Sequence, residues 1–428
     1  MIIYRARIFD TPTNPFTGGE LRADADVALV VDDGLIADRT DFATARSAHP
    51  DAEVVDLREG VLIPGLVDTH VHYPQVRAIG YLGKPLLEWL DRCALPEESK
   101  LGDEAYARAL ATEFLRGLTA AGTTSAMVFG SHFATAMDAL FTEAAEVGLR
   151  ITSGLVTSDR NLPEALLTTV ERSVAESQDL IDRWHGLGRL RFAVTPRFSY
   201  SASQELLAAG GQLVVDNPGI WVTSHLNENR DEIAGVAALF PEALDYLDTY
   251  DRAGLLGRRT ILAHNVHPSD RELTRMAETG AAAAHCPTSN STLASGFFPL
   301  RRHIEHGVRV ALGSDVGAGT GFCLLKEGVQ SYFMQQLDPS GGVALTSAHL
   351  LHLATAAGAA ALGLDAEVGD LSVGKRFDAV HIRPTAGEPL EVGNRHATSD
   401  EDALAKIFAM GTPGDIARVW VDGEPIKG

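Results

Sequence analysis

The segment VLIPGLVDTHVH at residues 61–72 gives the clearest indication of the fold. Its apolar, β-branched residues predict a buried strand, and this strand ends in His70 and His72. Residues two apart in a strand project to the same side, so both imidazoles can reach one ion. Because imidazole is a good ligand of Zn²⁺ and Fe²⁺, the segment predicts a strand that carries a metal site at its end.

Beyond this segment, short apolar strands alternate with Ala/Leu-rich helical stretches. The further strands are predicted at residues 123–129, 150–156, 189–196, 219–226, 259–264, 281–287 and 309–315. With the first strand they make eight strand–helix alternations, which are typical of a (β/α)8 barrel. We therefore predict an α/β fold, with a TIM-type barrel over residues 63–372.

Both ends of the chain have a different sequence pattern, in which short strand-like segments are separated by turns. Residues 1–62 contain β-branched segments broken by Asp-Gly and Pro turns, and residues 373–428 contain RFDAVHIRP and ARVWVDGEPI. Neither end is expected to fold alone. We predict that residues 1–62 and 373–428 together form one small β-sandwich domain.

Composition restricts the possible partners and location. The formal net charge is −21, which repels nucleic-acid backbones and anionic membranes. Three cysteines, few and odd in number, argue against a disulfide framework and for a reducing cytoplasm. Charges in the first ten residues interrupt any signal-peptide core, and no apolar run has the length of a membrane span. We expect a cytoplasmic protein that binds neither nucleic acid nor membranes, and a base without phosphate would bind such an acidic protein without penalty.

Polar residues gather at the predicted strand ends, where the catalytic residues of such barrels lie. They come from six of the eight strands and are His70, His72, Arg197, His225, His264, His285 and Asp315. The carboxylate of Asp315 would complete a three-histidine metal site, and Glu228 would move protons beside it. Each residue alone has a structural alternative: Asp315 as a helix cap, for example, or His285 as a buried core histidine.

The fourth predicted strand supplies a negative result. Barrel hydrolases with two bridged metals commonly need a carboxylated lysine at its end, but here the strand ends at Arg197. No lysine occurs between Lys100 and Lys326. The sequence therefore predicts a single metal ion.

These motifs resemble the amidohydrolase superfamily and, within it, the guanine deaminases. PGLVDTHVH marks the superfamily, and the continuation YPQ with PLLEWLDRCALPEE is similar to guanine deaminases specifically. PRFSYSAS, SHLNEN, ILAHNVH, HCPTSNSTLASGFFPL and GSDVGAGTGF follow in the family order, so the likeness covers nearly the whole chain.

The resemblance implies hydrolytic deamination of guanine to xanthine and ammonia by a metal-activated water. It implies one zinc ion per chain, with iron as the alternative, and a homodimer. The implied metal ligands are His70, His72, His225 and Asp315, and the implied catalytic residues are Glu228, His264 and Asp315. The expected substrate-binding residues are His72, Gln75, Arg197, Phe198, His225, Glu228 and Asp315.

Recognition of guanine makes chemical sense with these residues. Arg197 offers a fork of donors to the adjacent acceptors O6 and N7, Gln75 can both donate and accept, and Phe198 can stack on the base. Structural alternatives are a salt bridge for Arg197, core packing for Phe198 and a loop amide for Gln75. The apolar patch Leu86, Leu87, Trp89 and Leu90 is expected in the core, the pocket wall or a dimer interface.

Three other functions remain open at this point. A related aminohydrolase acting on 8-oxoguanine, a pterin or a triazine would use the same metal chemistry with a different pocket. A ring-opening, dihydropyrimidinase-like enzyme is disfavoured by the missing lysine. A catalytically inactive barrel scaffold would have lost metal ligands, yet all the expected ligands and Glu228 are present.

Overall fold

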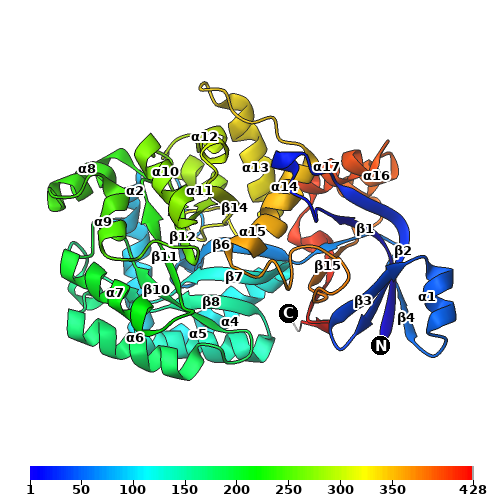
Figure 1. Cartoon of the computed structure of the whole chain (residues 1–428), viewed down its shortest axis with the longest axis horizontal. Coiled ribbons are helices and arrows are strands. Elements are labelled where there is room, and N and C mark those ends of the chain that lie inside the picture. Colours follow the sequence, from blue (N-terminus) through cyan, green and yellow to red (C-terminus); the bar gives the residue numbers. More distant parts are fainter. Residues whose placement is uncertain (427–428) are drawn as a thin grey trace.

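Eight parallel strands form a nearly closed barrel in the computed structural model, which describes residues 1–426 (Figure 1). In spatial order they are β6 (Leu66–His72), β7 (Thr123–Phe129), β8 (Arg150–Gly154), β10 (Arg191–Pro196), β11 (Trp221–Leu226), β12 (Thr260–His264), β13 (Ala282–His285) and β14 (Arg309–Leu312). The short strand β9 (Val156–Thr157) pairs with β10. The segment after β14 closes the ring, because Asp315 N donates to His70 O at 2.8 Å. The predicted (β/α)8 barrel is confirmed.

Helices surround this barrel and follow its strands (Figure 1). They are α4 (Glu104–Ala120), α5 (Ala134–Val147), α6 (Val170–Trp184), α7 (Gln204–Asp216), α8 (Arg230–Leu239), α9 (Tyr246–Arg252), α10 (Asp270–Thr279), α11 (Pro287–Thr292), α12 (Leu300–Glu305), α13 (Leu324–Leu337), α14 (Ser347–Ala354) and α15 (Ala356–Ala361). Polar caps fix where several begin: Asn229 and Ser269 form capping boxes at α8 and α10. These caps set the directions in which the strand-end loops leave the barrel.

A helical insertion lies between β6 and α4. It consists of η2 (Tyr73–Ala78), α2 (Leu86–Trp89), a π-helical turn η3 (Leu90–Ala94), α3 (Leu95–Ser99) and η4 (Lys100–Gly102). Trp89, Leu90 and Leu95 are buried against Phe198 in one apolar cluster. The insertion therefore covers the barrel beside the carboxyl ends of its strands.

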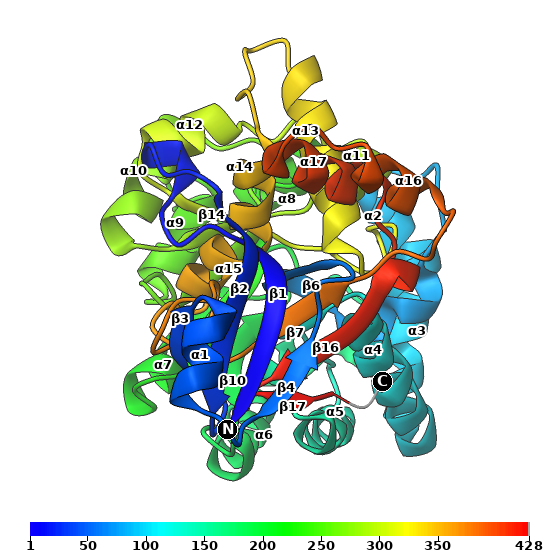
Figure 2. The same cartoon turned by 90° about the vertical axis from the view of Figure 1, so that its right-hand side faces the viewer.

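The two ends of the chain form one mixed sheet beside the barrel (Figure 2). Its strands are β1 (Ile2–Asp10), β2 (Arg22–Asp32), β3 (Leu35–Thr40), β4 (Glu53–Asp56), β5 (Val61–Pro64), β15 (Ala379–Ile382), β16 (Ile416–Val421) and β17 (Glu424–Pro425). Tyr4 stacks on Phe377 at 4.4 Å and meets Trp420 edge-on, so one aromatic cluster joins both ends. The predicted boundaries at 62/63 and 372/373 stay a prediction, and residues 427–428 lie outside the described residues.

Two details of the terminal unit differ from the sequence-based expectation. The segment predicted as one strand at 61–70 contains two strands, β5 and β6, which separate at Gly65. A Cβ there would lie 2.2 Å from Thr124 Oγ1, so the crossing from sheet to barrel requires glycine. The C-terminal segment, expected as strands, also contains α16 (Pro389–Arg395) and α17 (Asp400–Met410), while α1 (Phe42–Ala48) lies in the N-terminal one.

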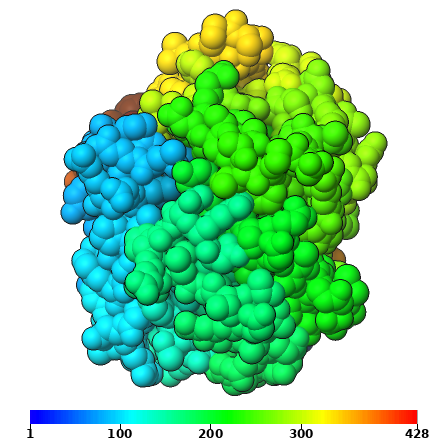
Figure 3. All heavy atoms as spheres, turned by 90° about the vertical axis from the view of Figure 1, so that its left-hand side faces the viewer, coloured from blue at the N-terminus to red at the C-terminus, as the bar shows by residue number. Residues whose placement is uncertain are grey.

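The terminal sheet is attached to one side of the barrel only. Arg150 of β8 donates to Asp378 at 2.8 Å and to Asp422 at 2.5 Å, which pins the C-terminal strands to the barrel. On the face turned away from the sheet, the surface is formed by the insertion, in blue, and by barrel segments coloured from cyan through green to yellow (Figure 3). Within residues 1–426, no helix combines the length and apolarity needed to cross a bilayer.

Candidate active site

Four side chains bring their donor atoms together at the carboxyl ends of the barrel strands. His70 and His72 end β6, His225 lies in β11, and Asp315 follows β14. His72 Nε2 lies 3.1 Å from His70 Nε2 and 3.2 Å from His225 Nε2. Asp315 Oδ1 lies 3.3 Å from His70 Nε2 and 3.1 Å from His72 Nε2. All four side chains are buried.

This donor set fits a divalent metal ion. His225 Nδ1 lies 2.7 Å from the carbonyl oxygen of Arg197, and only a protonated Nδ1 can donate there, so Nε2 keeps a free lone pair. In a tetrahedral zinc site the donor atoms lie about 3.3 Å apart, given metal–nitrogen distances of about 2.0–2.1 Å. The observed separations of 3.1–3.3 Å match this geometry. Without a cation, several imidazole lone pairs would face one another in a buried space.

The protonation states also suit metal binding, which requires neutral imidazole and ionised carboxylate. Burial lowers the pKa of His72 to about 4. Burial and the neighbouring imidazoles hold the pKa of His225 well below its ordinary value. Although burial opposes ionisation of Asp315, hydrogen bonds with His70 and His72 hold its pKa well below the usual range.

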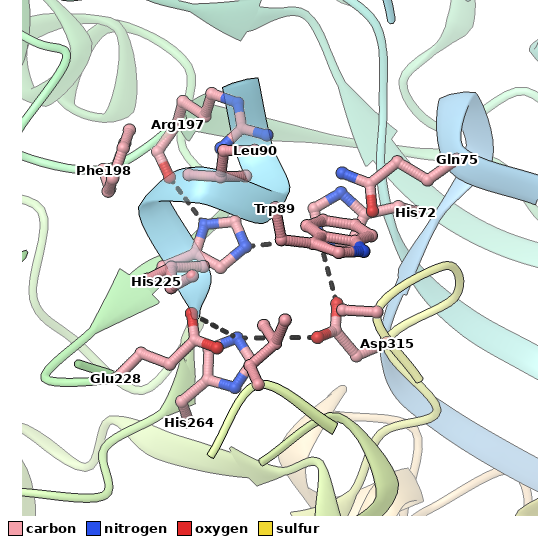
Figure 4. Close-up of a pocket in the computed structure, with 13 residues that line it drawn as sticks. His72, Gln75, Trp89, Leu90, Arg197, Phe198, His225, Glu228, His264 and Asp315 are labelled. Carbon is pink, nitrogen blue, oxygen red and sulfur yellow. Dashed lines mark hydrogen bonds and ion pairs between the residues drawn. The ribbon is translucent and has the colours of Figure 1, made fainter. Parts of the chain in front are cut away.

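Glu228 and His264 lie beside this cluster (Figure 4). His264 Nε2 lies 3.4 Å from Glu228 Oε2 and 3.8 Å from Asp315 Oδ2, while its Nδ1 faces Asn290 Oδ1 at 3.1 Å. Ser295 Oγ donates to Glu228 at 3.3 Å. Burial and the charge of Asp315 raise the pKa of Glu228 well above its ordinary value. The surroundings of Glu228 therefore favour its protonated form more than water does.

The backbone turns sharply where these residues leave their strands. Asn227, His264 and Asp315 adopt φ values of 50°, 71° and 47°, in the left-handed region that residues other than glycine seldom occupy. Such strain clusters at functional sites, where surrounding contacts hold it in place. One such contact is the buried Asp68 of β6, which accepts from Ser314 N at 3.0 Å and Ser314 Oγ at 2.5 Å.

A pocket lies over the donor set. Its wall combines the polar cluster with apolar side chains from the insertion and is lined by His72, Gln75, Leu86, Trp89, Leu90, Arg197, Phe198, His225, Glu228, His264, Leu293, Asp315 and Ala318. All the residues expected to bind substrate are in this lining. Figure 4 shows their polar groups arranged around a common centre.

Glu98 is a site residue that the sequence-based reasoning missed. It lies in α3, and its carboxylate accepts from Arg197 Nη2 at 2.7 Å and from Gln75 Nε2 at 2.8 Å. His132 Nδ1 lies 3.5 Å from its Oε2. Burial opposes ionisation, but the charges of Arg197 and His132 lower the pKa of Glu98 to about 2. The residue stands in the PLLEWLDRCALPEE motif, where nothing distinguishes it from Glu97.

Some residues that were candidates for the site lie outside the pocket lining. His285 is buried and stacks on Phe298 with ring centroids 4.3 Å apart, which matches its structural alternative. His267 lies beyond β12, where its Nε2 is 2.8 Å from the carbonyl oxygen of Ser295. Leu87 lines a neighbouring cavity, whereas Leu86, Trp89 and Leu90 line the pocket itself.

Comparisons with known proteins agree with this geometry. The chain matches the Amidohydrolase family over residues 61–426. A probable guanine deaminase of Deinococcus radiodurans is 58% identical, over 99% of this chain and 98% of its own length. The solved guanine deaminase of E. coli superposes with a TM-score of 0.96 at 37% identity, covering 100% of this chain and 99% of that chain. The solved guanine deaminase of C. acetobutylicum, which holds guanine in its active site, gives 0.92 at 28% identity and covers 100% of both chains.

Proposed function

This chain belongs to the amidohydrolase family, and we propose that it is a guanine deaminase that hydrolyses guanine to xanthine and ammonia. The observation that carries the proposal is the content of one buried pocket. It brings together candidate metal ligands, the buried carboxyl of Glu228, whose pKa is raised, and the pair Gln75 and Arg197. The guanine bound in the C. acetobutylicum relative supports a purine base as the ligand.

We assign one zinc or iron ion per chain to the four-residue donor set His70, His72, His225 and Asp315, whose donor atoms lie 3.1–3.3 Å from their neighbours. When bound, such an ion supplies Lewis acidity that lowers the pKa of a water molecule towards about 7. The absence of any lysine between Lys100 and Lys326 supports a single ion. Elemental analysis of the purified protein is expected to give about one zinc or iron per chain, and a reproducible value of two would contradict the assignment.

The carboxyl groups then account for the proton transfers. Water adds to C2 of guanine, and the carboxylate of Asp315 accepts the proton that this water loses. Glu228 gives its proton to N3, so that addition occurs across the C2–N3 bond. The amino group takes the proton held by Asp315 and leaves as ammonia. Glu228 recovers a proton from the C2 hydroxyl, which becomes the new oxo group of xanthine, and both carboxyl groups return to their starting states.

His264 occupies the position between these two carboxyl groups. Its Nε2 lies 3.4 Å from Glu228 and 3.8 Å from Asp315, while the amide oxygen of Asn290 accepts from Nδ1. Nε2 is therefore free to accept a hydrogen bond from the attacking water. We assign His264 the role of orienting that water towards C2.

The remaining residues of the pocket suit a flat, hydrogen-bonding base. Arg197 presents donors to O6 and N7, which are both acceptors in guanine. Adenine carries a donor amino group at position 6, and it would have to present C6 instead of C2 to the attacking water. Phe198 and the buried Trp89 supply apolar faces for the ring.

The test is a substrate panel. We expect guanine to have the highest kcat/KM for ammonia release when it is compared with 8-oxoguanine, a pterin, a triazine and adenine under one condition. If a pterin or a triazine led the series, the guanine assignment would be wrong, although a metal-dependent aminohydrolase would remain.

We also propose that the protein works as a homodimer in the cytoplasm. All three cysteines, Cys93, Cys286 and Cys323, are free thiols, as a reducing compartment favours. Phe333 and Leu337 of α13 expose apolar side chains that suit a contact with a second copy. Light scattering of the purified protein is expected to give twice the mass of one chain, and a monomer would contradict the dimer.

A further inference from the structure

The carboxylate of Glu98 contacts both residues that are proposed to read the base. Glu98 is 4% exposed, and Gln75 and Arg197 are each 2% exposed. Arg197 Nη2 and Gln75 Nε2 both donate to Oε1 of Glu98, at 2.7 and 2.8 Å. Three polar side chains from the insertion and from the end of β10 thus form one buried network.

This network determines which edge of Arg197 remains available. A guanidinium group has five N–H donors. Nη2 and Nε of Arg197 face Glu98 at 2.7 and 3.4 Å, so its side edge is occupied. The end of the group, formed by Nη1 and the second hydrogen of Nη2, remains for a ligand. Because Arg197 lines the pocket, this end offers two parallel donors to adjacent acceptors on a base.

The orientation of the Gln75 amide is determined in the same way. Its Nε2 donates to the carboxylate of Glu98 at 2.8 Å, and its Oε1 accepts from Gly317 N at 3.2 Å. A carboxylate only accepts and a backbone N–H only donates, so the amide cannot flip without losing both hydrogen bonds. One N–H and one oxygen lone pair of Gln75 therefore remain for the ligand in a fixed order.

We propose that Glu98 is a positioning residue that determines base specificity, because it fixes the order of donors and acceptors that Arg197 and Gln75 present to the purine edge. The inference rests on the proposed function, since it takes the ligand of this pocket to be a purine. Glu98 also balances the buried charge of Arg197, so its removal leaves an uncompensated cation that is free to turn towards other groups.

The experiment measures binding of two bases that lack the 2-amino group and differ at position 6. Hypoxanthine has the O6 acceptor and purine does not. Calorimetry on the metal-loaded protein is expected to show tighter binding of hypoxanthine. Glu98→Gln is expected to reduce this preference by about 10- to 100-fold, since a misplacement of about 1 Å can cost on the order of 10²-fold. Glu98→Asp, which keeps the charge, is expected to retain part of the preference.

The neighbouring residue supplies a matched control. Glu97 contacts Lys100 and accepts from Tyr106 Oη at 2.7 Å, so Glu97→Gln makes the same chemical change one position away. This control is expected to leave the preference unchanged. In an Arg197→Ala background, Glu98→Gln is expected to have little further effect on the preference, because the two residues act as a unit.

Two results would overturn the inference. One is an equal loss of affinity for both bases in Glu98→Gln, which would mean that Glu98 only supports the pocket. The other is an unchanged preference in a variant with normal metal content and melting temperature. If Glu98→Gln fails to fold, Glu98→Asp decides, because a full wild-type preference there contradicts the proposal. Guanine turnover of the wild type tests the proposed function separately.

Discussion

Two buried carboxyl groups near the active site, Glu228 and Glu98, have pKa values that are shifted in opposite directions. Glu228 lies near the charge of Asp315 and has a raised pKa, whereas the pKa of Glu98 falls to about 2 beside Arg197. Environment alone separates the roles of two chemically identical side chains. We assign the proton-donor role to the carboxyl beside Asp315 and the anchoring role to the carboxyl beside Arg197.

The first prediction concerns Glu228→Gln. Glutamine is nearly isosteric but cannot transfer a proton, so kcat for guanine is expected to fall by about 10²–10⁴-fold. Metal content is expected to stay normal, because Glu228 is outside the donor set of His70, His72, His225 and Asp315. Steady-state kinetics and elemental analysis on the same sample check both parts. Near-normal turnover would move the proton-transfer role elsewhere, with His264 the next candidate.

Arg197→Ala tests base recognition. We expect kcat/KM for guanine to fall by roughly 10²-fold or more, because a site built around a hydrogen bond loses its ligand when that bond is lost. The variant also leaves the carboxylate of Glu98 without its cation in a buried space. Metal content is expected to be unchanged. A similar kcat/KM for adenine and guanine in the wild type would argue against this reading of the pocket.

Five residues of the pocket lining could be predicted because they stand at strand ends, whereas Gln75 and Phe198 were implied by the family resemblance. His225 and Asp315 follow from the alternation of strands and helices alone. The role of Glu98 could not be predicted from the sequence, because it depends on the direction in which α3 orients the side chain. The adjacent Glu97 is chemically identical and belongs to the same helix. His285 also stands at a strand end, yet its ring stacks on Phe298. The orientation of this side chain depends on packing contacts that cannot be deduced from the sequence.

At the scale of elements, the site depends on close approach between the first and last barrel strands. Gly313 follows β14, and a Cβ there would lie 2.9 Å from His70 Cβ and 3.0 Å from His70 N. The missing side chain therefore lets β14 approach β6 where the donor set is built. The same approach brings Asp315 N within 2.8 Å of His70 O.

Gly313→Ala is expected to push His70 out of position. Overpacking of this kind typically costs about 1–3 kcal/mol, and metal affinity is expected to fall with it. The control is Gly257→Ala, because a Cβ at Gly257 meets no atom within 4 Å. Denaturant unfolding and metal titration of both variants provide the measurement. Equal stability and equal metal affinity in the two variants would mean that β6 and β14 can move apart without disturbing the metal site.

The sequence identified all eight barrel strands but not every element around them. Strands of a parallel barrel are buried on both sides, so each appears as a short apolar run. The break at Gly65 was missed because β5 and β6 form one continuous apolar stretch, although they belong to different sheets. Helices α16 and α17 were not predicted, because the β-branched segments on either side of them led us to expect only strands in this region.

At the scale of the whole molecule, buried acids make stability depend on pH. Glu327 of α13 is buried, where its carboxyl accepts from Thr288 N at 3.0 Å and Thr288 Oγ1 at 2.7 Å. Burial raises its pKa from 4.5 to about 8. The folded state therefore holds this proton more tightly than the unfolded state. Its contribution to stability is complete below pH 4.5 and is lost as the pH rises through about 8.

Glu327→Gln is expected to remove this dependence. Between about pH 5 and pH 9 the melting temperature of the wild type should fall relative to that of the variant, because glutamine does not ionise. Thermal unfolding of metal-loaded samples at several pH values gives the difference. Parallel curves for the two proteins would mean that Glu327 is ionised throughout this range.

The pairing of β5 with β15 also affects how the chain is made on the ribosome. Residues 61–64 leave the exit tunnel early, but their partner at 379–382 is synthesised roughly 300 residues later. At about 5–20 residues per second the delay is on the order of 15–60 s. During that time the edge of β5 is an open strand that other nascent chains can join. A chaperone that shields this edge during translation is therefore expected to raise the soluble yield more than one added after release.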